Sequence, residues 1–379
     1  MSRDPLTGFF RKKEPSLRPD LLTAVGAPIM SRTRLNVPYD LDDKDLEHAA
    51  MTAVVLGQPL LLAGNPGVGK SKFAGELANK LKLEMLEPFR VKSSNEGLDL
   101  FYRYDEVGRF RGDADAPKSS HVDFGALGRA ILLSVGPDHV IGSYEDFGHL
   151  LARGNDNQEI QGETGDARAP NASEQVTLGQ LFPKDFFVNG KRIEEPTRTV
   201  VLIDELDKAP RDAPNDILGE IENLEFWISE LQLSIKAKPE FWPIVVITSN
   251  SERSLPDAFL RRCIFHWIEN PTKERLIKIV HLHLEHHCGE GNAPALDSEF
   301  IKSAYTAYSS TKKKVSNKKP ATAEFIGFTL ALWARKNDAQ ASFSMDGDGD
   351  ADVRQVIGTL LKTKTDRLQV YPDDVPAAS

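Results

Sequence analysis

The stretch Pro59–Ser71, PLLLAGNPGVGKS, decides the fold of this chain. Its first part, Pro59–Ala63, is wholly apolar, which is typical of a short parallel strand that is covered on both faces. Its second part, Gly64–Ser71, fits the pattern G-x-x-x-x-G-K-[ST] of a phosphate-binding loop. The next segment, Lys70–Leu81, carries apolar residues at helical spacing. A strand, a glycine-rich loop and a helix in this order predict an α/β core that binds phosphate groups.

The residues of this loop have separate chemical roles. Glycine lacks a Cβ atom, so backbone N–H groups can curl around phosphate oxygens, and the start of the next helix adds partial positive charge. We expect Lys70 to reach the β- and γ-phosphates of a nucleotide and the Ser71 hydroxyl to ligate Mg²⁺. The alternative is a glycine-rich turn without a ligand. The residues expected to touch the nucleotide are Gly64, Asn65, Pro66, Gly67, Val68, Gly69, Lys70 and Ser71.

A second apolar run, Thr199–Ile203, ends in two acidic residues, Asp204 and Glu205. An acid at the carboxyl end of a buried strand points into the crevice where α/β proteins bind ligands. We expect Asp204 to contact the nucleotide site by holding Mg²⁺ through water, and Glu205 to orient or deprotonate the attacking water. The alternative is that Asp204 only caps the following turn. A glutamate in the second position favours a hydrolase over a nucleotide kinase, which must exclude water.

A third apolar run, Ile244–Thr248, is followed by Asn250. We expect the Asn250 amide to hold the attacking water together with Glu205, although asparagine is also common at plain strand-to-loop turns. Between the second and third runs, Asn215–Leu224 has helical spacing and is preceded by Pro214. Strands that alternate with helices predict a parallel sheet with helices on both faces, an αβα sandwich.

Two arginines, Arg261 and Arg262, end the stretch Leu255–Cys263, LPDAFLRRC. Arginine stabilises the charge on a transferring γ-phosphoryl group. If these side chains face outward, the nucleotide that they touch belongs to a neighbouring subunit, and the active site is shared between copies of the chain. The alternative is a pair of surface arginines in ion pairs within the chain. The sequence does not decide which arginine has the catalytic role.

The predicted organisation has three parts. Residues 1–40 are rich in proline and charge and are expected to form an arm. Residues 41–270 form the α/β core, and residues 271–379 form a mostly helical lid and tail. Lys70 and Asp204 lie 134 positions apart, whereas a βαβ unit needs only about 30 residues. We therefore expect insertions at about 91–190, including a polar loop at Gly154–Gln175.

Composition narrows the class of protein. The 379 residues are 40% hydrophobic and 27% charged, as in globular domains, and the net charge is −9. This acidic balance argues against coating of nucleic acid or of anionic membranes, although a local basic patch is not excluded. Cys263 and Cys288 have no metal or redox spacing, and the N-terminal stretch has no long apolar run. These features predict a soluble, cytoplasmic protein without a membrane span.

The motifs together resemble the AAA+ superfamily and, within it, the MoxR-type ATPases. They occur in the order GNPGVGKS, VVLIDELDKAP and ITSNSERSLPDAFLRRC, and Leu98–Phe110 and Phe124–Leu133 are also similar to MoxR-type sequences. The resemblance implies an αβα core, a helical lid, ATP as the nucleotide, and a homo-oligomeric ring, typically a hexamer. It also implies loops from the 91–190 region at a pore or ring face. MoxR-type proteins are thought to remodel partners, often with a von Willebrand factor A domain. No such domain is apparent here, so the partner would be a separate chain.

One position departs from the family pattern. The family usually has an arginine at the start of a lid helix that senses the nucleotide, and the matching position here is Ala323. Lys318 or Lys319 could supply a point charge, but not the forked geometry of arginine. A nucleotide-gated scaffold with little turnover is favoured if the missing arginine disables hydrolysis. A motor that acts on nucleic acid or in a restriction or defence complex also stays open, because related AAA+ rings share these motifs. The histidine-rich stretch HLHLEHHC, 281–288, has no zinc spacing and is interpreted as the polar end of a lid helix.

Overall fold

The computed structural model describes the chain in two compact units. One contains Asp43–Asn65 and Lys70–Ile268, and the other contains Pro66–Gly69 and the described residues from Glu269 onward. The predicted arm at 1–40 and most of the predicted loop at 154–175 lie outside the described residues. The described residues are 43–111, 116–151, 173–210, 213–216, 218–250, 252–288, 293–336, 339, 341–342 and 351–371.

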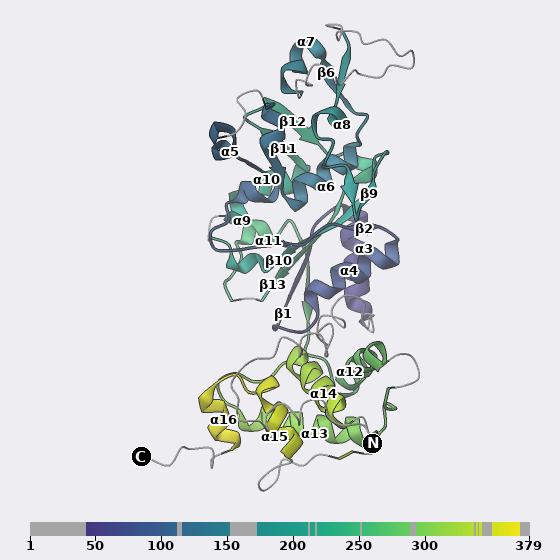
Figure 1. Ribbon diagram of the computed structural model, residues 1–379, viewed down its shortest axis with the longest axis vertical. Helices are drawn as coiled ribbons and strands as arrows, with labels where there is room; N and C mark the ends of the chain where they lie inside the picture. Colours follow the sequence, from purple (N-terminus) through teal and green to yellow (C-terminus); the bar gives the residue numbers. More distant parts are fainter. Residues whose placement is uncertain are drawn as a thin grey trace, which may run out of the picture. The chain divides into compact units, whose positions relative to one another are not determined.

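A parallel sheet forms the centre of the first unit (Figure 1). Its order is β14-β1-β13-β10, and two short strands, β2 and β3, both pair with β10. Every residue of β13 is buried, and so are the first five of β10. Successive strand residues point to opposite faces, so both faces of these strands are covered. The α/β prediction is confirmed. The strands are β1 (Leu60–Gly64), β2 (Glu84–Met85), β3 (Phe89–Arg90), β10 (Thr199–Asp204), β13 (Ile244–Ser249) and β14 (Ile264–Ile268).

Two helices flank the first strand along the chain. Helix α3 (Lys44–Leu56) begins after Asp43, whose side chain accepts a hydrogen bond from the N–H of Leu46, and ends at Gly57 in the left-handed region, with φ 65°. Helix α4 (Lys70–Leu81) has the predicted bounds. Its buried stripe of Phe73, Ala74, Leu77 and Ala78 repeats at helical spacing, and α4 packs against β10 and β1. This packing fixes the start of α4 beside the carboxyl ends of the strands.

The helix predicted at Asn215–Leu224 differs from the structure. Helix α9 (Ala213–Asp216) begins before Pro214, and α10 (Leu218–Asn223) ends before Leu224. Leu224 is buried and adopts a left-handed φ of 48°, so the chain leaves the helix there. It enters a hairpin of β11 (Glu225–Ile228) and β12 (Leu233–Lys236). Apolar spacing alone could not show this turn, because the Leu224 side chain stays in the core while its backbone reverses.

The predicted insertion contains its own small elements. Helix α6 (Ala126–Val135) is almost completely buried and packs against β10. It lies so close to Phe101 that a Cβ atom at Gly128 would overlap the Phe101 carbonyl oxygen. The other elements are α5 (Glu106–Arg111), α7 (Tyr144–Phe147), α8 (Leu178–Leu181) and three antiparallel strand pairs: β4 (Tyr102–Tyr104) with β5 (Val122–Phe124), β6 (Val140–Ser143) with β7 (Gln175–Thr177), and β8 (Phe187–Val188) with β9 (Lys191–Arg192).

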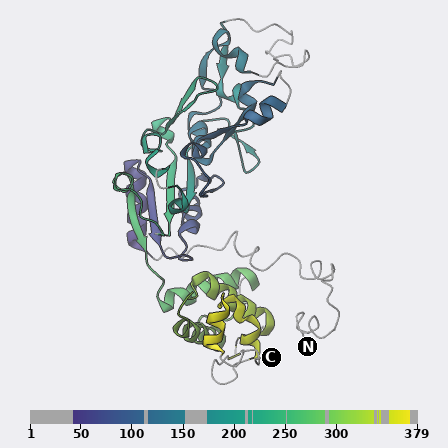
Figure 2. The same ribbon diagram turned by 90° about the vertical axis from the view of Figure 1, so that its left-hand side faces the viewer.

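Helices make up the second unit, coloured green to yellow in Figure 2. Its core contains Phe300, Phe325 and Phe328, which have no exposed surface, and Phe300 meets Trp333 edge to face with ring centroids 5.0 Å apart. The described part of the chain has no helix long and apolar enough to cross a membrane. The helices are α12 (Lys273–Cys288), α13 (Glu299–Lys314), α14 (Thr322–Lys336), α15 (Ala351–Val356) and α16 (Lys364–Val370).

Candidate functional site

The predicted site residues lie at one edge of the sheet. Asp204 ends β10, Asn250 follows β13, and β1 ends at Gly64. The strands β1, β13 and β10 are parallel neighbours, so these ends lie next to one another. In parallel α/β sheets this edge is where ligands bind. The topology therefore brings together residues that are almost 190 positions apart in the sequence.

Lys70 connects the glycine-rich loop to Asn250, the residue that follows β13. Its ammonium group donates to the carbonyl oxygens of Gly64 at 2.7 Å and Asn65 at 3.0 Å, and to the Asn250 Oδ1 at 2.8 Å. Between β1 and α4, Gly67 and Gly69 have φ values of 81° and 100°, which side chains with a Cβ atom rarely adopt. The two glycines leave the loop backbone without Cβ atoms at these positions, so that a ligand could approach it closely.

Burial changes the electrostatics of Lys70, which is 6% exposed. Burial lowers the pKa of its ammonium group, and the negative charges of Asp207, Asp204 and Glu205 oppose that shift. Three carboxylates thus gather around one cation. The carboxylates could offset the positive charge of a metal ion. Lys70 and that metal ion could together offset the negative charge of a phosphate group.

Asp204 lies between two hydroxyl groups. Ser71 donates to the Asp204 Oδ1 at 2.7 Å, and Thr248 donates to the same oxygen at 2.6 Å. Hydroxyl and carboxylate oxygens are hard ligands, and Mg²⁺ commonly takes only one or two from the protein while it keeps several waters. The donor set of Ser71 and Asp204 therefore fits Mg²⁺. Thr248 has no exposed surface and was not among the predicted site residues.

Glu205 is held from three sides. The Asn250 side-chain amide donates to its Oε1 at 3.2 Å, the Lys208 ammonium lies 2.6 Å from its Oε2, and its own N–H donates to the Thr248 hydroxyl at 2.9 Å. Its backbone is left-handed, with φ 61°. A non-glycine residue in this conformation is strained, and such residues concentrate at functional sites. Asn250 thus joins Lys70 to Glu205, as the predicted pairing of Asn250 with Glu205 requires.

Asp207 is a further member of the site that sequence reasoning missed. It is 3% exposed, and its carboxylate accepts the backbone N–H groups of Asn250 at 3.1 Å and Glu252 at 3.0 Å. The signal was present, because Asp207 and Lys208 both follow within three residues of Glu205. Nothing in the spacing showed that Asp207 turns inward to the next strand while Lys208 turns to Glu205.

The two arginines have different surroundings. The Arg262 guanidinium pairs with Glu222 at 2.9 Å and donates to the Ala258 carbonyl at 3.0 Å. For Arg262, the structure therefore agrees with the alternative prediction of a surface arginine in an ion pair within the chain. Arg261 ends helix α11 (Asp257–Leu260) as its C-cap, is exposed, and has no ion pair among the described residues. The structure thus separates two side chains that the sequence left equivalent.

Two other predictions concern the helical unit. Ala323 lies in the first turn of α14, which agrees with its expected place at the start of a helix. The histidine-rich stretch forms the end of α12, where His281 lies 3.6 Å from Glu285. Among the described residues, no group of three or more histidine, cysteine, aspartate or glutamate side chains is placed to hold a metal ion.

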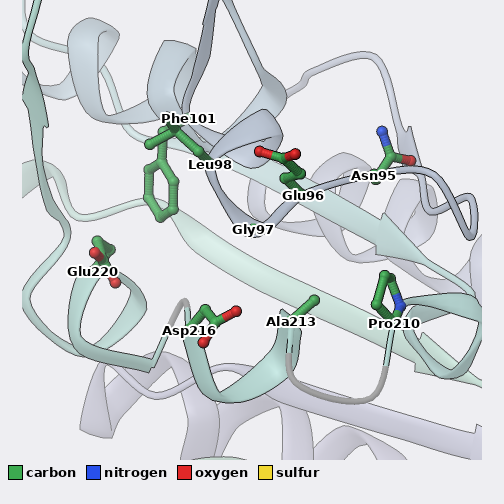
Figure 3. Close-up of a pocket in the computed structure, with 9 residues that line it drawn as sticks. All are labelled: Asn95, Glu96, Gly97, Leu98, Phe101, Pro210, Ala213, Asp216 and Glu220. Carbon is green, nitrogen blue, oxygen red and sulfur yellow. The ribbon is translucent and has the colours of Figure 1, made fainter.

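A separate pocket of about 400 Å³ lies beside the loop that follows β3 (Figure 3). Glu96, Asp216 and Glu220 point toward it, and Phe101 and Leu98 form part of its apolar wall. None of the predicted nucleotide-site residues lines it. None of the residues that line this pocket is basic, whereas Lys70 lies among the carboxylates at the sheet edge.

No protein-family model matches the chain, and no curated protein does. Two solved structures of NtrX from Brucella abortus are similar. The one in complex with ADP has 10% identity and a TM-score of 0.41, and covers 83% of this chain and 54% of its own. The other has 11% identity and a TM-score of 0.43, and covers 95% and 59%. The chain thus spans little more than half of NtrX, and likeness at this level carries no functional argument.

Proposed function

We propose that this chain hydrolyses ATP with Mg²⁺ at the edge of the sheet formed by β1, β13 and β10. The observation that carries the proposal is the continuous chain of contacts from Lys70 through the Asn250 amide to Glu205. Lys70 follows the glycine-rich loop, and Glu205 follows the acid that fits Mg²⁺. Asn250 therefore contacts both Lys70, which can bind the γ-phosphate, and Glu205, which can accept a proton from water.

Each residue has a role in attack of water on the γ-phosphate. The loop N–H groups and Lys70 bind the phosphates, and Ser71 and Asp204 hold Mg²⁺, which when bound offsets charge between the β- and γ-phosphates. Asn250 and Glu205 position the water, and Glu205 accepts its proton. Asp207 fixes the backbone of Asn250, and Thr248 fixes the carboxylate of Asp204. Hydrolysis needs little covalent chemistry from the protein, so positioning and charge supply most of the rate.

We further assign the chain to the AAA+ ATPases of MoxR type. The order of the three motifs supports this assignment, together with a parallel α/β unit and a separate helical unit. ATP rather than GTP follows from the same resemblance. On this assignment the chain is a cytoplasmic chaperone that remodels or activates a separate protein, possibly one with a von Willebrand factor A domain. A neighbouring copy in a ring, typically a hexamer, completes each site through Arg261, the arginine that Glu222 does not engage.

Replacement of Glu205 by Gln tests the proposal. Glutamine keeps the shape of the side chain and can still contact Asn250, but it cannot accept a proton. We expect ATP binding within a few-fold of wild type and loss of turnover by at least about 10². Titration calorimetry and phosphate release measure the two quantities. Glu222→Gln, an exposed carboxylate outside the site, is the matched control. Near wild-type turnover by Glu205→Gln would remove the catalytic assignment.

A further inference from the structure

Lys208 contacts the residue that we propose to accept a proton from water. Its ammonium group donates to the Glu205 Oε2 at 2.6 Å, whereas the Asn250 amide donates to the other oxygen, Oε1, at 3.2 Å. Among the described residues, these are the two side chains that contact the Glu205 carboxylate. The carboxylate is therefore held at both oxygens, at one by a neutral amide and at the other by a cation.

An anchored turn determines where the Lys208 side chain begins. Leu206–Lys208 form a 3₁₀ turn after Glu205, and the N–H of Lys208 donates to the carbonyl oxygen of Glu205 at 3.0 Å. In such a turn, side chains three positions apart lie above one another. The two residues between them, Leu206 and Asp207, are buried, and Asp207 accepts N–H groups from the segment after β13. The buried part of the turn thus places Lys208 beside Glu205.

The charge of Lys208 is stabilised by this contact. The hydrogen bond to Glu205 raises the pKa of Lys208, and the negative charges of Glu205, Glu252 and Asp207 act in the same direction. Lys208 therefore stays charged at neutral pH. Lys70, the other cation of the site, donates to the Asn250 Oδ1 and to loop carbonyls instead of to Glu205. The two lysines thus act on different parts of the site.

A carboxylate that accepts a proton from water has to keep one orientation. The glutamate side chain has several rotatable bonds, and one hydrogen bond leaves the carboxylate free to turn about the bonded oxygen. A second contact at the other oxygen removes that freedom. The orientation matters for the rate, because a displacement of about 1 Å in a reacting group can cost about 10²-fold.

We propose that Lys208 is a positioning residue for hydrolysis, which holds the Glu205 carboxylate at the oxygen that Asn250 does not contact. This inference rests on the proposed function of Glu205. Lys208 is exposed, and among the described residues it has no hydrogen bond or ion pair with the glycine-rich loop or with Asp204. Its removal should therefore affect cleavage of ATP and leave binding of ATP unchanged.

The test compares full-length wild type with Lys208→Met, Lys208→Arg and a matched control, Lys236→Met. Methionine removes the charge and keeps an unbranched side chain. We expect Lys208→Met to lower kcat about two- to fivefold, the range that an exposed ion pair supports, with the Kd for ATP and the melting temperature unchanged. Lys208→Arg should restore most of the rate. Lys236 also forms an exposed ion pair, with Glu225 at 3.1 Å, and Lys236→Met should keep the wild-type kcat.

A double-mutant cycle shows whether Lys208 acts through Glu205. In single-turnover experiments, Lys208→Met should change the residual rate of Glu205→Gln by less than about twofold, because the glutamine accepts no proton in either protein. An equal loss of rate in both backgrounds would overturn the inference, because Lys208 would then act on another group.

Other outcomes separate this inference from the proposed function. An unchanged or raised kcat of Lys208→Met would overturn the inference and leave the proposed function intact. A weaker binding of ATP or a lower melting temperature that accounts for the lost rate would show a structural role and would also overturn the inference. Equal rates of wild type and Glu205→Gln would instead remove the proposed function and this inference together.

Discussion

Asp207 acts on the site through the backbone of another strand. Its buried carboxylate accepts the N–H groups of Asn250 and Glu252, and Asn250 in turn contacts Lys70 and Glu205. A side chain that fixes backbone groups sets the position of the residues proposed to bind the nucleotide. Asp207 is thus a positioning residue, two steps from the expected γ-phosphate.

Replacement of Asp207 by Ala should therefore lower both stability and turnover. Two N–H groups lose their acceptor, which costs about 2–3 kcal/mol in the free energy of unfolding when such groups stay buried. Chemical denaturation followed by circular dichroism measures this loss. Asp138→Ala removes an exposed carboxylate and should change stability by no more than about 0.5 kcal/mol. If Asp207→Ala has the stability of wild type, water replaces the carboxylate, and Asp207 does not fix the backbone of Asn250 and Glu252.

The sequence was informative about the residues that we propose to touch phosphate and less so about the residues that support them. The motifs predicted Lys70, Ser71, Asp204, Glu205 and Asn250, and the structure places all five at one sheet edge. Phosphate chemistry demands those residue types at fixed distances from a strand end, so a local pattern reveals them. The roles of Thr248, Asp207 and Lys208 depend on which way a turn points each side chain. The tertiary fold determines these directions, and the local sequence pattern does not show them.

Among the elements, strands and helices with buried, regular faces were predicted best. Helix α4 has the predicted bounds because its apolar stripe packs on the sheet along its whole length. The segment 215–224 was predicted less well, since Leu224 leaves the helix while its side chain stays buried. The antiparallel strand pairs of the insertion have two to four residues per strand, too few for alternation to be recognised.

The loop between α8 and β8 contains a titratable group that couples pH to stability. Burial raises the pKa of Asp185 from its ordinary value of 3.8 to about 6. Asp123 adds to this effect, and Arg129 and Lys184 oppose it. The Arg129 side chain donates to the backbone carbonyls of Asp185 and Phe187, which ties this loop to α6. The Asp185 carboxyl group therefore binds a proton more tightly in the folded chain than in the unfolded chain.

Asp185 should make the first unit less stable as pH rises. The folded state binds the proton more tightly than the unfolded chain, so the contribution is full below pH 3.8 and is lost as pH rises through about 6. Asp185→Asn cannot ionise. The melting temperature of wild type relative to that of Asp185→Asn should fall as pH rises across this window. The corresponding loss in the free energy of unfolding is about 2–3 kcal/mol at most. A difference that stays constant from pH 4 to pH 7 would contradict the raised pKa.

The proposed role of Arg261 requires more than one copy of the chain. Arg261 is exposed and has no ion pair among the described residues, whereas Arg262 is engaged with Glu222. An arginine that completes the site of a neighbour contributes nothing to its own site. The proposed ring is then needed for turnover, and each site is assembled from two chains.

Mixing of two inactive variants tests this requirement. Arg261→Ala should lose turnover by about 10³ or more, whereas Arg262→Ala should lose much less, because it breaks only an exposed ion pair. A mixture of Arg261→Ala with Glu205→Gln contains interfaces where an intact Glu205 meets an intact Arg261. Phosphate release by the mixture should exceed the sum of the two variants alone. Phosphate release by a mixture of Arg262→Ala with Arg261→Ala serves as the comparison. No gain in the first mixture would contradict a shared site.

The central claim is that Glu205 promotes attack of water on an ATP held by Lys70. The most direct measurement is a single turnover, in which radiolabelled ATP with Mg²⁺ is mixed with excess protein and quenched with acid over time. We expect wild type to convert its bound ATP to ADP, while Glu205→Gln retains the bound nucleotide as ATP for at least about a hundred times longer. Equal rates of ADP formation in the two proteins would contradict the account.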